Sequence, residues 1–257
     1  MNKLKVIAPV MTVALTLAAC SNAPVLSSAD KSAASEVAKQ PATKTSVESG
    51  ESIKEFWTWF NLHQQDLSAM NGPDAPIFPE IGQHIKAIDD SLVFEIGPAP
   101  EGEKEFAVSA NGNEALFPLV KNIVAAAPQI KGWKIVAFRQ KTPPAILKQL
   151  AISAQPTKNG QVIAGAEPMG VAVKDMRFTI KKDGDMAKVT IFIKNFKDDG
   201  PQSHMAEMML HQAVGEYDLV KKIKEIDCKP DNAPEAKNAK PFEELGDALD
   251  KLLPDAK

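Results

Sequence analysis

MRFTIKKDGDMAKVTIFIKNF, residues 176–196, is the stretch that decides the fold class. Its first residues alternate between apolar and polar side chains, which places Met176, Phe178 and Ile180 on one face of a strand. The Asp-Gly pair that follows is a strong signal for a tight turn. KVTIFIKNF then returns with a second alternating run. The stretch therefore predicts a β-hairpin with one buried face.

A helix and one ambiguous segment follow this hairpin. Residues 204–214, HMAEMMLHQAV, predict a helix that Gly215 ends or interrupts. In residues 218–228, DLVKKIKEIDC, the apolar spacing fits a helix, while the last part, IKEIDC, fits a strand. With the strand preferred, this half of the chain has the order strand, strand, helix, strand.

The same order of elements precedes the hairpin. Residues 91–97 and 104–110 predict two strands joined by a Pro-Gly-rich turn. Residues 113–128 predict a helix that Asn113 caps and that Pro118 delays or bends, and residues 132–140 predict another strand. The halves share little residue identity, so a tandem ββαβ pseudo-repeat is predicted from element order alone.

Helices flank the two halves. Ser52 and Glu55 form a capping-box pattern at the start of an aromatic helix, and residues 76–90 predict a second helix. We therefore predict an α+β fold in which two helices precede a mixed, largely antiparallel sheet with packed helices. Residues 51–229 form a single domain in this prediction. Residues 230–257 form a linker and a terminal helix that packs on the domain.

The first 21 residues resemble the leader of a bacterial lipoprotein. Two lysines precede about fourteen mostly apolar residues, which is too short a run for a permanent membrane span. Leu17-Ala18-Ala19-Cys20 resembles a lipobox, at which a signal peptidase cuts before a lipid-modified cysteine. The resemblance implies a signal peptide at residues 1–19 and acyl chains, palmitate among them, on Cys20. The alternative is an ordinary secretory signal with an incidental cysteine.

The residues after Cys20 predict a flexible stalk. Residues 20–50 are rich in Ser, Ala, Thr and Lys and contain no aromatic residue, so they cannot bury enough apolar surface to offset the entropy of ordering. Ser21 resembles the class of lipoproteins that is sorted to the outer membrane. The resemblance implies a location on the periplasmic face of the outer membrane.

Charge and cysteine content argue against nucleic-acid binding and against an intramolecular disulfide. The net charge of −3 becomes −5 without Lys3 and Lys5, since 28 basic residues then face 33 acidic ones. A mildly acidic chain with two arginines argues against nucleic acid as a partner. Cys228 is the other cysteine, so no intramolecular disulfide forms if Cys20 is acylated. We expect Cys228 to be a buried, unreactive thiol.

One metal site and one set of binding residues are candidates. His204, Glu207 and His211 are spaced three and four residues apart on a predicted helix, a pattern that could hold zinc or copper. The alternative interpretation is a helix that buries its methionines against a sheet. Trp57, Trp59 and Arg139 are candidate binding residues.

The motifs FWTWF, EFAVSANGNEALFPLV, AAAPQIKGWKIVAFRQ and AVGEYDL support a second resemblance. They are similar to those of an uncharacterised family of bacterial proteins in which an aromatic helix precedes a mixed sheet. The resemblance covers residues 52–228. It implies a fold and no reaction.

No catalytic motif is recognisable, and no cofactor is predicted. We interpret the chain as a lipid-anchored envelope lipoprotein that acts as a binding or interaction module. Its partners would be the membrane, through the acyl chains, and an unknown protein or small-molecule ligand. The alternative is a periplasmic small-molecule hydrolase or metal-dependent enzyme.

Overall fold

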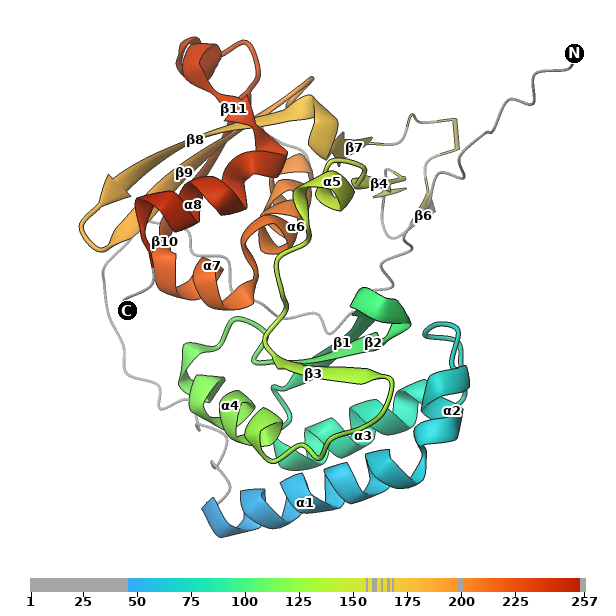
Figure 1. Cartoon of the computed structure of the whole chain (residues 1–257). Helices are drawn as coiled ribbons and strands as arrows, with labels where there is room; N and C mark the ends of the chain where they lie inside the picture. The colour runs from blue at the N-terminus through green and yellow to red at the C-terminus, as the bar shows by residue number, and fades with distance from the viewer. Residues whose placement is uncertain are drawn as a thin grey trace, which may run out of the picture.

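The computed structural model describes residues 46–254, except 156, 159, 160, 163, 166, 168 and 198–200. It confirms the α+β class and the tandem ββαβ order (Figure 1). In each half, two antiparallel strands are followed by helix and then by a strand that pairs in parallel with the second strand. We call these halves the first and second units.

The first unit contains β1 (Val93–Pro98), β2 (Lys104–Ser109), α4 (Phe117–Ala125) and β3 (Trp133–Ala137). Its sheet has the order β1-β2-β3. The predicted cap is present, because the Asn113 side chain accepts a hydrogen bond from the Ala115 N–H at 3.1 Å. Pro118 lies in the first turn of α4, where its missing N–H costs nothing.

The second unit contains β8, β9, α6, α7 and β10, and its sheet has the order β10-β9-β8-β11. Gly184, with a φ of 66°, supports the predicted Asp-Gly turn between β8 and β9. Residues 218–228, whose pattern fits either a helix or a strand, contain both, because α7 ends at Lys222 and β10 begins at Ile223. The bounds are β8 Met176–Asp183, β9 Met186–Ile193, α6 Gln202–Val214, α7 Glu216–Lys222, β10 Ile223–Pro230 and β11 Lys240–Pro241.

Helices cover one face of each sheet. Figure 1 shows α1 and α3 with α4 on one side of the first sheet, and the second unit on the other side. In the second unit, α6 and the C-terminal α8 pack against the sheet. The bounds are α1 Ser46–Leu62, α2 Gln64–Ala69, α3 Phe78–Ile88 and α8 Leu245–Leu252.

The start of the first helix was wrongly predicted. Ser52 lies inside α1, which begins at Ser46 within the predicted stalk. A capping box is a local preference worth about 1 kcal/mol, and the tertiary packing of an apolar helix face outweighs it.

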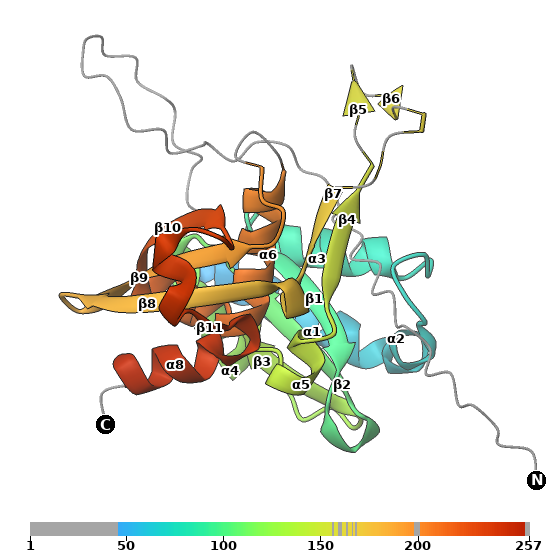
Figure 2. The same ribbon diagram turned by 90° about the horizontal axis from the view of Figure 1, so that it is seen from above.

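The remaining elements are short. A two-stranded ribbon, β4 with β7, connects the units, and β5 with β6 continues it toward its tip (Figure 2). The bounds are α5 Pro144–Leu147, β4 Ala151–Ala154, β5 Thr157–Lys158, β6 Gln161–Val162 and β7 Met169–Ala172, with single 3₁₀ turns at Pro100–Gly102, Glu114–Leu116, Val173–Asp175, Pro234–Asn238 and Phe242–Glu244.

Each unit has its own hydrophobic core. The first core is rich in aromatic rings from α1, β2 and β3, whereas the second consists mainly of aliphatic and methionine side chains. Leu245 and Leu249 of α8 are fully buried in the second core. The span predicted as a single domain, residues 51–229, therefore contributes to two cores, and the second core also contains residues of α8. The predicted domain boundaries remain a prediction.

Candidate functional site

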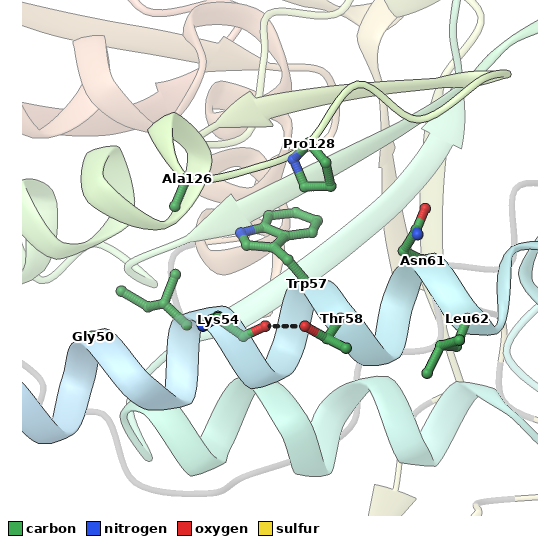
Figure 3. A pocket seen from close by; sticks show the side chains of 9 residues that line it. Gly50, Lys54, Trp57, Thr58, Asn61, Leu62, Ala126 and Pro128 are labelled. Carbon is green, nitrogen blue, oxygen red and sulfur yellow. Dashed lines mark hydrogen bonds between the residues drawn. The ribbon is translucent and has the colours of Figure 1, made fainter.

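Trp57 lies at the edge of the first core rather than on an exposed platform. Its side chain is 3% exposed, and its indole N–H donates to the Ile123 carbonyl at 2.8 Å. This bond joins α1 to α4, so a large part of the role of Trp57 is structural. One side of the residue still borders a surface hollow (Figure 3).

The hollow beside α1 has a volume of about 420 Å³ and is open to solvent. Its wall is mainly apolar, and at its end the Leu62 side chain is 76% exposed. Figure 3 shows Trp57 between α1 and the segment that carries Ala126 and Pro128. The lining residues are Gly50, Ile53, Lys54, Trp57, Thr58, Asn61, Leu62, Ala126 and Pro128.

Trp59 forms a separate cluster with two histidines. Its ring stacks on His84 with a centroid distance of 4.4 Å and contacts His63 at 4.9 Å. Burial lowers the pKa of His84, and the charge of His63 lowers it further against the opposing effect of Glu80. The structure therefore does not bring Trp59 to the hollow that Trp57 borders.

Arg139 lies at the junction between the units. Its guanidinium pairs with Glu95 on β1, with 3.3 Å between Nε and Oε2. Its backbone N–H donates to Oε2 of Glu216 at 3.3 Å, while Oε1 of Glu216 accepts from the Gly112 N–H at 3.1 Å. The Glu216 side chain is fully buried. We call this arrangement the Glu216 junction.

Unusual backbone conformations build the Glu216 junction. Asn111 and Gly112 both have positive φ, and the Asn113 N–H closes their turn on the Ala110 carbonyl, which leaves the Gly112 N–H free for Glu216. Phe138 is buried with a φ of 68°, a strained conformation for a bulky residue. Gly215 has a φ of 74°, and a Cβ atom there would lie 3.0 Å from the Arg139 carbonyl oxygen, so a larger residue would be strained.

The Glu216 junction explains what three of the quoted motifs do. SANGN, FR and GEY lie far apart in the sequence and meet around one carboxylate. Both oxygens of this carboxylate accept backbone N–H groups, so it ties chain segments together. Sequence reasoning did not single out Glu216, because a glutamate after a glycine is locally ordinary and its partners lie 77 and 104 residues away.

The predicted metal ligands do not converge. His204 and Glu207 are exposed, with 4.0 Å between Nδ1 of His204 and Oε2 of Glu207. His211 is half-buried near the Glu216 junction. His204 and His211 are seven residues apart, which is about 10 Å along a helix and too far for one tetrahedral ion. Among the described residues, no group of three His, Cys, Asp or Glu side chains could hold a metal ion.

His211 faces the junction instead. Burial lowers its pKa, and the positive charge of Arg139 lowers it further. Its Nδ1 atom is buried and has no hydrogen-bond partner among the described residues. The neutral form of His211 is therefore the one that the folded protein favours.

Cys228 on β10 is half-buried, whereas a buried thiol was expected. Burial raises its pKa to about 11, despite a hydrogen bond with Ser203. A thiol with this pKa is almost entirely protonated at neutral pH and is a poor nucleophile. Cys20, the predicted lipidation site, lies outside the described residues.

Comparisons with protein-family models, curated proteins and solved structures found no match to this chain. Across the described residues, no helix has the length and apolar character needed to cross a bilayer.

Proposed function

We propose that this chain is a bacterial envelope lipoprotein, anchored through acyl chains on Cys20, whose folded body acts as an interaction module. The sequence Leu17-Ala18-Ala19-Cys20 after a basic and then apolar leader is the observation that carries the proposal. Two or three acyl chains hold a protein on a membrane far more firmly than the marginal binding of a single chain.

The position of α1 fits an anchor of this kind. The helix begins at Ser46, so 25 residues separate the proposed anchor at Cys20 from the folded body. As the flexible stalk that the sequence predicts, a segment of this length would have a root-mean-square span of about 28 Å and a taut reach of about 90 Å. The body would stand clear of the lipid headgroups. We propose the periplasmic face of the outer membrane as its location, from Ser21.

Features of the body support an interaction module over a hydrolase. The buried carboxylate of Glu216 is engaged by backbone N–H groups of two other segments. The hollow beside α1 is shallow and mainly apolar, and Leu62 is exposed at its end. An apolar surface with few convergent polar groups suits contact with another macromolecule better than catalysis.

The anchor is tested by comparing the full chain with its Cys20→Ala and Cys228→Ala variants in the native envelope. We expect the parent chain and Cys228→Ala to fractionate with membranes and to carry the added mass of acyl groups. Cys20→Ala should lack that mass and leave the membrane fraction. Retention of Cys20→Ala in the envelope, or an unmodified mass for the parent chain, would overturn the proposal.

A further inference from the structure

The ribbon formed by β4 and β7 has one covered edge and one open edge. The edge of β7 that faces away from β4 packs against α6. There the side chain of Gln202, which is 6% exposed, donates to the Gly170 carbonyl at 3.2 Å. β4 has β7 as its sole strand neighbour in the described part of the chain. Its other edge is open, and the ribbon projects from the body in Figure 2.

The hydrogen-bond pattern shows which groups β4 presents at this open edge. The Val173 N–H donates to the Leu150 carbonyl at 3.0 Å, so residues 150 and 173 form a bonded pair at the start of the ladder. Bonded pairs alternate along antiparallel strands, so the next bonded residue of β4 is Ile152. The backbone N–H and C=O groups of Ala151 and Ser153 therefore point outward. The outward carbonyl of Gly170, which pairs with Ser153, agrees with this alternation.

β4 lacks the features that prevent pairing at other open edges. The β10 edge carries Lys224, Glu225, Asp227 and Lys229 and ends in a proline, β1 contains a glutamate and a proline, and β3 contains a lysine. Charges and prolines of this kind discourage a second chain from adding a strand. β4 reads Ala-Ile-Ser-Ala and has none of them. Ala151, Ser153 and Ala154 are exposed.

We propose that β4 is a dimerisation edge that pairs in antiparallel fashion with β4 of a second copy of this chain. A register that places Ala151 opposite Ser153 of the other copy satisfies the outward groups of both residues about a two-fold axis at Ile152. No charged residue lies between Lys148 and Lys158, so two copies meet here without repulsion between charges on the paired strands. This inference deepens the proposed interaction module, because it names a second copy of the chain as the partner. It rests on the proposed function, since the membrane anchor would concentrate the copies on one surface.

Photo-crosslinking in the native envelope tests the proposal. A photoreactive amino acid replaces Gln155 in the full chain, because this exposed residue follows β4 directly. We expect a covalent product of twice the chain's mass. The same reactive group at Lys188, on the outer face of the second sheet, should give no such product.

Two variants at Ser153 separate backbone pairing from side-chain contact. Ser153→Pro removes one outward N–H and leaves the bonds between β4 and β7 in place, so the crosslinked dimer should fall at least tenfold. Ser153→Ala should preserve the dimer. Matching far-ultraviolet circular dichroism spectra and urea midpoints would show that both variants fold.

Three results would overturn the proposal: no crosslinked product, a product with a different protein, or a dimer that Ser153→Pro leaves intact. These outcomes are distinct from failure of the anchor, which is read from membrane fractionation and acyl mass. If the dimer forms and Cys20→Ala nevertheless stays in the envelope, the pairing of β4 is supported and the lipid anchor on Cys20 is rejected.

Discussion

The two units have the same strand order and pairing directions but different cores. Phe106 on β2 contacts five aromatic rings in the first unit, with centroid distances between 5.2 and 6.5 Å, from Phe56, Trp57, Phe60, Phe94 and Trp133. In the second unit, Ile191 lies in a core of mainly aliphatic and methionine side chains, in which Phe178 and Phe242 are the buried aromatic residues among those described. The comparison shows that this topology depends on where apolar side chains fall, and much less on their chemical type.

The contrast also supplies a spectroscopic probe for each unit. The three tryptophans of the chain, Trp57, Trp59 and Trp133, all lie in or against the first core. Tryptophan fluorescence therefore reports unfolding of the first unit, whereas far-ultraviolet circular dichroism reports both. The effect of a variant in one unit on the unfolding of the other unit can therefore be measured.

The largest expected effect comes from truncating a core residue in either unit. Phe106→Ala should cost about 3–5 kcal/mol of unfolding free energy and Ile191→Ala about 2–5 kcal/mol, because each leaves a cavity. Urea unfolding measured by both probes checks this. Since the Glu216 junction is buried between the units, we expect Ile191→Ala to shift the fluorescence transition as much as the dichroism transition. A fluorescence transition that stayed at the parent midpoint would show that the units unfold separately.

A smaller loss is expected at the Glu216 junction. Glu216→Ala leaves the N–H groups of Gly112 and Arg139 without their acceptor, which should cost about 2 kcal/mol. Glu216→Gln keeps one acceptor oxygen and should cost less. The urea transitions from the two probes should separate in Glu216→Ala, because the variant weakens the link between the units.

Glu114→Ala is the matched control for this junction. Glu114 also joins the units, through Lys221, but both side chains are solvent-exposed. Exposed ion pairs contribute little to stability, so the two transitions should stay coincident in this variant. Equal effects of Glu114→Ala and Glu216→Ala would contradict a special role for the buried carboxylate.

The smallest expected effect is a dependence of stability on pH. Burial lowers the pKa of His211 in the second unit and of His84 in the first below the ordinary value of 6.5. The unfolded chain therefore binds more protons as the pH falls through about 6.5, and the free energy of unfolding decreases. Urea midpoints between pH 7.5 and pH 5 should show this decrease. His211→Gln should reduce the slope measured by circular dichroism. An unchanged slope in His211→Gln would remove His211 as a cause.

Local patterns predicted most of the second sheet and its connections. The alternation of Met176 and Phe178 matches their burial, since both are 1% exposed, and Gly184 forms the predicted turn. Asn113 caps its helix because a cap requires only neighbouring backbone groups. Among the candidate binding residues, Trp57 borders the hollow beside α1, whereas Arg139 lies at the Glu216 junction. The two residues therefore do not form one site.

The amino-acid sequence by itself determined the ββαβ order of the two units, the turn at Gly184 and the motif at Cys20. These features depend on residues within a few positions of each other. The tertiary structure alone decided that the repeated halves have separate cores, that Glu216 ties distant segments together and that the edge of β4 is open. Such features depend on partners dozens of residues away, and the energy of a buried contact does not depend on sequence separation once the chain is folded.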